Sequence, residues 1–400
     1  MRILLSTIGS RGDAQPLVAL AVALREAGHQ ARLCVPPDFR ECIEGLGFRV
    51  STVGPELRAL TAGRAAAPPL PGTPEQRRQL AEGTVAAQFE VLSEAAQDVD
   101  LVVAATALQI AARTVTEVHR IPYVFAAYAP TVLPSPHHAP PPIPGRAPIA
   151  SDATNQKLWD RDRDSFNDLF GEPLNAQRRQ LGLAPVDDVR AHVFGDVPLV
   201  AADPTLGPWP GPPGAVVQKG AWLLRDERPL GPHVEAFLDA GEMPLYFGLG
   251  SMRAPSGVGA AMVMAARALG RRALVNRGWG DIEIEDADDM IAIDEVNHQA
   301  LFPRVAAVVH HGGAGTTTAA AMSGTPQVVV PRSYDQPYWA SRVQALDIGV
   351  AHSPGTPSAE SLTLALKRAL QPAVAQRAAT VARAIVLDGA RAAAAQLASG

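Results

Sequence analysis

Short apolar runs alternate with stretches of helical spacing along most of the chain. Residues 3–7 begin with three apolar residues and predict a first strand, and apolar positions between 17 and 27 then keep the three-and-four spacing of a single helix face. Gly28 follows as a stop signal. Further strands are predicted at 31–35, 48–53, 101–104, 123–126 and 199–201, and helices at 74–98, 108–118 and 154–181. This alternation predicts a parallel sheet wrapped by helices.

The second half of the chain repeats the pattern. Strands are predicted at 244–248, 272–276, 290–293, 305–309 and 327–330, and helices between them, at 358–370 and from 373 to about 399. Residues 203–214 are dense in proline and glycine and predict a semi-rigid hinge. We therefore expect two Rossmann-like α/β domains, residues 1–205 and 206–379. They should face each other across a cleft, with ligands at the carboxyl ends of the strands.

A glycine-rich turn joins the strand at 305–309 to the helical residues that start near 319. Backbone N–H groups and the helix dipole attract phosphate at such a junction. His311 can donate to a phosphate oxygen, and Thr316 can donate its hydroxyl. The stretch Gly313, Ala314 and Gly315 lets the backbone approach closely. The pattern predicts the diphosphate pocket of a nucleotide-sugar donor, with a purely structural glycine turn as the alternative.

Three further turns follow predicted strands in this half. Gly250 and Ser251 offer close backbone approach and a hydroxyl. The backbone of Glu295 and Val296 could hydrogen-bond a pyrimidine edge, although local sequence alone favours a surface turn. Asp335 and Gln336 place a carboxylate beside an amide, which can bind the vicinal hydroxyls of a sugar. A helix start capped by the aspartate is the alternative there.

The first turn of the chain carries a candidate base. Asp13 stands just beyond the first strand, and a carboxylate there can take the proton of an acceptor hydroxyl if the transfer is concerted with attack. A helix cap is an equally good interpretation of Asp13 from local sequence. Arg11 could steady an anionic donor, or it could be a solvated loop residue.

Composition narrows the class of protein. Hydrophobic residues make up 47% and charged residues 19%, so large cores can form, and the net charge of -5 argues against a general nucleic-acid binder. The thiols of Cys34 and Cys42 fit a reducing compartment, and no apolar run approaches the roughly 18 residues of a membrane span. We expect a cytoplasmic protein without membrane insertion. The alternating Asp and Arg residues at 160–164 predict a solvated helix face, and no metal site is expected.

Together, these motifs resemble the GT-B glycosyltransferases that decorate natural products, most closely those of glycopeptide antibiotic biosynthesis. The resemblance runs essentially end to end. It rests on residues 2–6 with 9–13, 134–137, 218–222 with 226–229, 247–251, 277–279, 295–299 and 310–317. Sterol and other lipid glucosyltransferases share the first turn and the His311 turn, so a sterol, lipid or polyketide aglycone is the alternative. No histidine follows the first strand, where many members carry their base, and this departure places that role on Asp13.

The resemblance implies a GT-B fold and an inverting, metal-independent transfer. A hexose, with glucose favoured by Asp335 and Gln336, would pass from a UDP- or TDP-sugar to a hydroxyl of a natural-product aglycone. No cofactor is implied beyond this co-substrate. The last helix, about 380–400, would cross back onto the N-terminal domain. On the acceptor side we assign Ser10, Pro134 and His137, within or facing the loop at 130–148, and we expect a monomer or dimer.

Two functions of other classes stay open at this point. A GT-B sugar epimerase would use the same donor pocket without an acceptor, and a non-catalytic GT-B protein would activate a partner enzyme. An NAD-dependent dehydrogenase is disfavoured because the turn after the first strand lacks the required glycine fingerprint.

Overall fold

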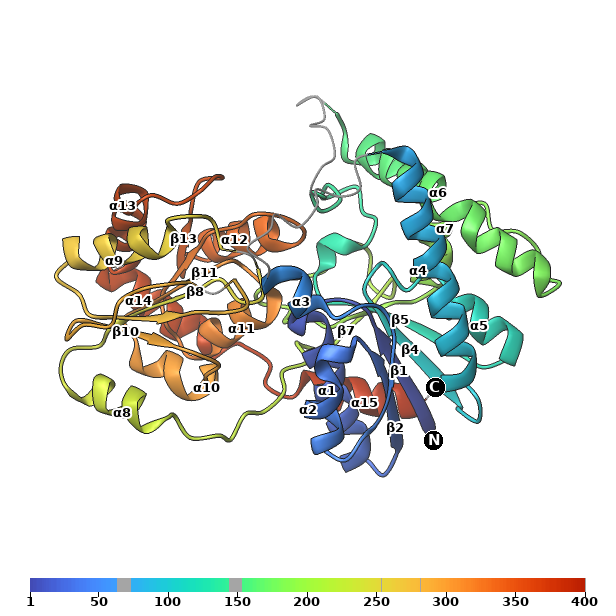
Figure 1. Ribbon diagram of the computed structural model, residues 1–400, viewed down its shortest axis with the longest axis horizontal. Helices are drawn as coiled ribbons and strands as arrows, with labels where there is room; N and C mark the ends of the chain where they lie inside the picture. The colour runs from blue at the N-terminus through green and yellow to red at the C-terminus, as the bar shows by residue number, and fades with distance from the viewer. Residues whose placement is uncertain (63–72, 144–152, 253, 281, 400) are drawn as a thin grey trace.

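The computed structural model describes residues 1–62, 73–143, 153–252, 254–280 and 282–399. Two α/β domains lie side by side, each built on one sheet in which every pairing is parallel (Figure 1). The strand order is β3-β2-β1-β4-β5-β6-β7 in the N-terminal sheet and β10-β9-β8-β11-β12-β13 in the C-terminal sheet. The predicted fold class is confirmed. No helix within the described residues is long and apolar enough to cross a bilayer.

The N-terminal domain alternates strands and helices from its first residues. Its strands are β1 (Arg2–Thr7), β2 (Gln30–Val35), β3 (Arg49–Thr52), β4 (Leu101–Ala105), β5 (Tyr123–Ala127), β6 (Leu199–Val200) and β7 (Val217–Gln218). Its helices are α1 (Arg11–Glu26), α2 (Arg40–Gly45), α3 (Leu57–Ala62), α4 (Pro74–Ala95), α5 (Ala112–His119), α6 (Asn155–Gln180) and α7 (Val189–Phe194), with short 3₁₀ turns η1 (Pro37–Phe39) and η2 (Pro130–Val132).

The C-terminal domain follows the same plan. Its strands are β8 (Leu245–Gly248), β9 (Ala273–Asn276), β10 (Met290–Ile293), β11 (Ala307–His310), β12 (Gln327–Val329) and β13 (Gly349–Ala351). Its helices are α8 (Pro232–Asp239), α9 (Val258–Ala268), α10 (His298–Leu301), α11 (Ala314–Met322), α12 (Gln336–Ala345), α13 (Ala359–Ala369) and α14 (Pro372–Ala382), with η3 (Phe302–Arg304) between α10 and β11.

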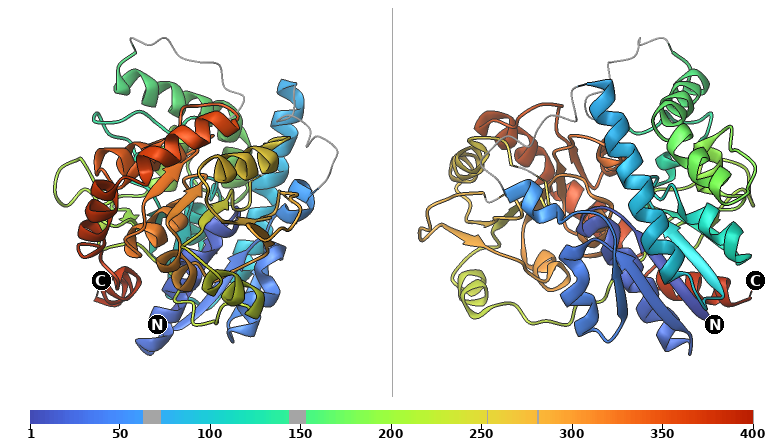
Figure 2. Two further views of the ribbon diagram at one scale, coloured as in Figure 1. Left: turned by 90° about the vertical axis from the view of Figure 1, so that its left-hand side faces the viewer. Right: turned by 45° about the vertical axis from the view of Figure 1, so that its right-hand side comes forward.

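The end of the chain departs from the single alanine-rich helix that its composition predicts. Helix α14 ends at Ala382, and α15 (Gly389–Ser399) forms separately and packs against α1 of the N-terminal domain (Figure 1 and Figure 2). The break is held by the hinge, because buried Asp203 accepts the Val386 amide at 2.8 Å. A Cβ on Gly389 would lie 2.4 Å from the carbonyl carbon of Gly220, so α15 approaches the chain too closely for a side chain there.

The hinge region also extends the first sheet. Strand β7 pairs with β6 through Leu199 and Val217, so this sheet continues beyond residue 205, where the sequence analysis placed the domain boundary. A second difference lies before α5, which starts at Ala112 and not near residue 108. The Gln88 side chain donates to Leu108 O at 2.8 Å and accepts from Ala111 N at 3.1 Å, which holds this stretch as a turn.

The expectation of a solvated charge stripe at 160–164 was wrong for one residue. Asp162 is 1% exposed and forms an ion pair with the guanidinium of Arg190, whose Nε lies 2.7 Å from Asp162 Oδ2. The same guanidinium lies 4.0 Å from the ring centroid of Phe166. The alternating charges of this segment therefore include one member of a buried ion pair that joins α6 to α7.

Candidate active site

The two histidines of the glycine-rich turn have different environments. His310 is fully buried at the end of β11, where its Nε2–H donates to Gln327 Oε1 at 2.9 Å and its Nδ1 accepts the Gly312 amide at 3.1 Å. Burial lowers the pKa of His310 to about 3, so the ring is neutral and structural. This leaves His311 as the histidine of the turn that can meet a ligand.

The His311 ring lies between two glycines. A Cβ on Gly250 would lie 2.7 Å from His311 Cε1, and a Cβ on Gly313 would lie 2.6 Å from His311 Nε2. Burial lowers the pKa of His311 to about 4, and its buried Nδ1 has no hydrogen-bond partner among the described residues. A buried polar atom without a partner is costly, so this geometry favours a ligand that supplies one.

Helix α11 begins immediately beyond this ring. Its N-cap, Gly313, has no side chain to cap the first turn, and the first amide bonded within the helix is that of Thr317, which donates to Gly313 O at 2.9 Å. The amides of Ala314, Gly315 and Thr316 therefore form the open end of the helix dipole. The hydroxyls of the two threonines that follow bond back to helix carbonyls, so Thr316 is the threonine whose hydroxyl faces a ligand most readily.

Asp13 occupies the first turn of α1. Its Oδ2 accepts the Ser10 amide at 2.7 Å and lies 3.3 Å from Ser10 Oγ, so it does cap the helix. A Cβ on Gly9 would lie 2.2 Å from the same oxygen, which explains the glycine before it. Burial raises the pKa of Asp13 to about 7, and the charge of Asp335 adds to the shift. Asp13 is thus both a cap and a carboxyl that titrates near neutrality.

Asp335 lies at the start of α12 in the other domain. Its Oδ2 accepts the indole N–H of Trp339 at 2.8 Å, and burial raises its pKa to about 6. The side chain of the neighbouring Gln336 is bonded within the protein, because its Oε1 accepts the Arg332 amide at 2.9 Å and its Nε2 lies 2.8 Å from Sδ of Met252, in the turn after β8. Of the predicted sugar-binding pair, Asp335 is the member that interacts electrostatically with Asp13.

Arg11 connects the domains. Its guanidinium forms an ion pair with the carboxylate of Glu295, and Arg228 Nη1 lies 3.3 Å from the same carboxylate. Burial opposes ionisation of Glu295, but these two arginines outweigh it and lower its pKa. Asn297 holds the loop that carries Glu295 and half-buried Val296, since its Nδ2 donates to Asp226 O at 2.9 Å. Arg11, at the start of α1, therefore contacts the loop that the sequence predicts to bind the base.

Ser251 is half-buried in the turn after β8, beside Gly250, which has a φ of 65°. The Trp279 amide donates to Gly250 O at 3.2 Å. The Trp279 ring stacks on Phe39 of the N-terminal domain, with centroids 6.1 Å apart and planes 21° apart. Sequence reasoning missed this contact between domains, and no local pattern at either aromatic residue signals it.

The predicted acceptor residues Pro134 and His137 are exposed on the proline-rich loop, where the His137 amide donates to Ser135 Oγ at 3.2 Å. No interaction among the described residues joins either side chain to Asp13. Ser10, by contrast, contacts the Asp13 carboxylate directly. Part of the loop predicted at 130–148, residues 144–148, lies outside the described residues.

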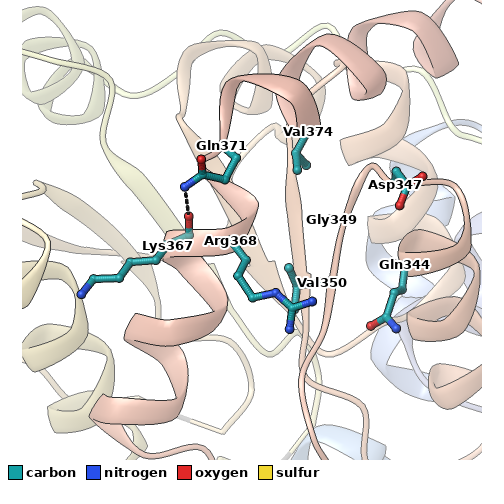
Figure 3. A pocket seen from close by; sticks show the side chains of 8 residues that line it. All are labelled: Gln344, Asp347, Gly349, Val350, Lys367, Arg368, Gln371 and Val374. Carbon is teal, nitrogen blue, oxygen red and sulfur yellow. Dashed lines mark hydrogen bonds between the residues drawn. The ribbon is translucent and has the colours of Figure 1, made fainter.

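A separate surface pocket of about 420 Å³ lies at the far edge of the C-terminal sheet, between α12, β13, α13 and α14 (Figure 3). Its lining includes Asp347, Lys367 and Arg368, and none of the predicted site residues. The Gln371 side chain bonds Lys367 O at 2.9 Å on its rim. This pocket is distinct from the residues gathered where the domains meet.

The fold and the gathered residues together define a class. Helix α1, which carries a carboxyl of raised pKa, contacts helix α11, whose glycine-rich start follows His311, where the two parallel-sheet domains meet. This is the arrangement of the glycosyltransferases of the GT-B fold. Residues 3–135 match the glycosyltransferase family 28 N-terminal domain, and residues 283–393 match the C-terminal domain of the erythromycin biosynthesis protein CIII-like family.

Curated relatives cover nearly the whole chain. Glycosyltransferase GtfE of Amycolatopsis orientalis is 46% identical over 98% of this chain and 96% of its own length. Vancomycin aglycone glucosyltransferase of the same organism is 44% identical over the same shares. The chain therefore belongs to the GT-B glycosyltransferases of natural-product biosynthesis, as its motifs predicted, and it is an enzyme of that activity.

Solved structures agree on the fold. The glycosyltransferase of kitacinnamycin superposes with a TM-score of 0.73 at 19% identity, covering 100% of this chain and 98% of the other. Glycosyltransferase VinC in complex with dTDP gives a TM-score of 0.67 at 21% identity, covering 100% and 99%. At these identities the likeness establishes the two-domain architecture alone.

Proposed function

We propose that this enzyme transfers a hexose from a UDP- or TDP-sugar to a hydroxyl of a glycopeptide antibiotic precursor, with inversion and without a metal ion. The observation that carries the proposal is the pairing of two features from different domains. Asp13, whose pKa is raised to about 7, lies within the electrostatic reach of Asp335, and Asp335 shares a domain with the open start of α11. The N-terminal domain thus supplies a base, and the C-terminal domain supplies a site that binds the anionic diphosphate.

Asp13 acts on the acceptor. As a carboxylate it accepts the proton of the acceptor hydroxyl while that oxygen attacks the anomeric carbon from the face opposite the diphosphate. A base is most effective when its pKa lies near the working pH, and burial brings Asp13 into that range. A phenolic hydroxyl, with a reference pKa of about 10, is a less demanding proton donor than an aliphatic alcohol.

The C-terminal domain acts on the leaving group. Negative charge grows on the diphosphate as its bond to the sugar breaks. The open first amides of α11, the Thr316 hydroxyl and the His311 nitrogen, which has no partner among the described residues, are the groups that would bind this charge. Preorganised donors of this kind stabilise a developing anion without reorganisation. They supply the positive field that would otherwise come from a metal ion, and the neutral His311 donates a single N–H.

The names of two relatives support the choice of substrates. One is a vancomycin aglycone glucosyltransferase at 44% identity, and another is a dTDP-epi-vancosaminyltransferase at 40% identity, both from Amycolatopsis orientalis. The Asp335 carboxylate can accept from the hydroxyls of a sugar such as glucose, whereas the Gln336 side chain is bonded to Arg332 and Met252. We propose no further cofactor, a monomer or dimer, and a cytoplasmic enzyme, which its free thiols Cys34 and Cys42 suit.

A matrix of donors against acceptors tests the proposal. UDP-glucose, TDP-glucose and a TDP-deoxyaminosugar are each incubated with vancomycin aglycone, a sterol and a polyketide aglycone, with and without a chelator. We expect the aglycone to gain the mass of one glucose, with the chelator having no effect. Donor consumption without an acceptor would identify a hydrolase or an epimerase, and transfer to the sterol alone would overturn the acceptor class.

A further inference from the structure

Tyr334 combines two unfavourable features in the loop between β12 and α12. Its φ is 56°, in the left-handed region that bulky residues rarely adopt, and its side chain is 54% exposed. A strained backbone at a bulky residue persists only where the surroundings impose it, and such positions gather at functional sites. Tyr334 directly precedes Asp335, so the strain lies at the proposed sugar site.

The surroundings that impose this conformation come from both domains. The Tyr334 amide donates to Pro142 O at 2.9 Å, which ties the loop to the proline-rich segment of the N-terminal domain. On either side, the Ser333 amide lies 3.3 Å from Gln336 Oε1 and Asp335 is held by Trp339. The backbone of Tyr334 is therefore fixed while its ring stays open to solvent.

The phenol lies close enough to the base to sense its charge. Burial of the Tyr334 hydroxyl raises its pKa, and the negative charge of Asp13 raises it further. The exposed ring thus belongs to the same region as the Asp13 carboxylate, although it is carried by the donor-binding domain. An exposed aromatic ring on a fixed backbone, near the proposed base, offers a flat apolar surface to the molecule that presents its hydroxyl to Asp13.

We propose that Tyr334 is an acceptor-contact residue through which the C-terminal domain completes the acceptor site, its ring packing against an aromatic ring of the aglycone. This inference rests on the proposed function. It assigns the acceptor site to both domains, in place of the N-terminal domain alone. The bond from Tyr334 to Pro142 then makes acceptor binding depend on the two domains being held together.

Three variants separate the ring from the backbone. Tyr334→Ala removes the ring, Tyr334→Asn removes it but tolerates the left-handed conformation, and Tyr334→Phe keeps it. With vancomycin aglycone as the probe, we expect the first two to raise the acceptor KM about tenfold and the third to change it less than about twofold. The KM for UDP-glucose should stay within about twofold in all three, since the ring faces the acceptor.

Met264→Ala on α9 is the matched control, because this side chain is 61% exposed and lies on a helix remote from Asp13. Calorimetry of the aglycone with UDP-saturated enzyme provides a second measurement that needs no turnover. Aglycone affinity that falls in Tyr334→Asn supports the inference even if no sugar is transferred, an outcome that would defeat only the proposed function. Unchanged affinity in both ring-deleting variants, or wild-type enzyme that binds no aromatic aglycone, overturns it.

Discussion

Asp13 has two tasks that compete for the same carboxylate. Capping the Ser10 amide favours the ionised form, while burial and Asp335 favour the neutral form, and the second set prevails to raise the pKa to about 7. The unfolded chain has an ordinary aspartate. Between about pH 4 and 7 the folded chain therefore keeps a proton that the unfolded chain releases, and stability from this group falls over that window.

Replacing Asp13 with Asn should slow transfer strongly and leave the fold intact. We expect turnover to fall by about 10² to 10⁴, with UDP affinity unchanged, because Asn can accept the Ser10 amide but cannot take a proton. Wild-type turnover should rise with pH through about 7 as Asp13 ionises. Steady-state rates across pH and calorimetry with UDP provide the measurements, and a flat pH profile would remove Asp13 as the base.

His311→Ala should weaken nucleotide binding. Its Nδ1 has no hydrogen-bond partner in the part of the chain that the structure describes, and a bond to a charged phosphate contributes about 1.5–3 kcal/mol, or roughly ten- to a hundredfold in affinity. Calorimetry with UDP and TDP measures the loss. His119→Ala, an exposed histidine on α5, is the control and should bind both nucleotides normally. Equal affinities in the two variants would dismiss the phosphate role.

The positions of candidate residues were predictable only where the sequence pattern is local. Asp13 and His311 stand out because each follows a predicted strand beside glycines. Asp162 did not, since its burial depends on Arg190, which lies on another helix. The placement of Tyr334 likewise depends on how two domains pack, which no spacing in the sequence encodes.

Helix α11 and the turn before it form a close-fitting unit around one ring. The sequence predicted that Gly250 and Gly313 let the backbone approach a ligand. In the structure both glycines also make room for the His311 ring, which lies against them. The strand and the helix were predictable because the apolar run and the glycines coincide. Strands β7 and β13 were not, because β7 follows the proline- and glycine-rich stretch and ends in Gln218, and β13 opens on Gly349, so neither is marked by a clear apolar run.

Gly313→Ala should displace the His311 ring. Its added Cβ would lie 2.6 Å from His311 Nε2, a clash that costs about 1–3 kcal/mol, so UDP affinity should fall about tenfold while the helix itself persists. Gly171→Ala within α6 is the matched control, because its Cβ would meet nothing within 4 Å. Calorimetry and circular dichroism measure the two effects. Full UDP affinity in Gly313→Ala would show that the ring position is unimportant.

At the scale of the molecule, several contacts hold the domains together around the site. Arg11 pairs with Glu295, Phe39 stacks on Trp279, and Tyr334 bonds Pro142. Each joins a segment of the N-terminal domain to a loop that follows a strand of the C-terminal domain. The sequence predicted two domains and a hinge, but it could not predict these contacts, since each pairs residues more than a hundred positions apart.

A double-mutant cycle distinguishes the two roles open to Arg11. Neutral variants, Arg11→Gln, Glu295→Gln and the double, avoid a new repulsion from Arg228. If Arg11 acts by joining the domains, the pair should show a coupling of about 0.5–1 kcal/mol in the donor KM, weaker at high salt. If the effects of the two single variants simply add in the double variant, Arg11 does not act by joining the domains. A raised donor KM in Arg11→Gln would then indicate contact with the diphosphate.

In the proposed reaction, a base from the N-terminal domain and an anion-binding helix start from the C-terminal domain together perform a single displacement at the anomeric carbon. The most direct measurement is the mass and anomeric configuration of the product formed from vancomycin aglycone and an α-linked UDP- or TDP-glucose. We expect one added glucose in the β configuration with wild-type enzyme, and the same product formed about 10² to 10⁴ times more slowly with Asp13→Asn. An α-linked product, or undiminished product from Asp13→Asn, would contradict it.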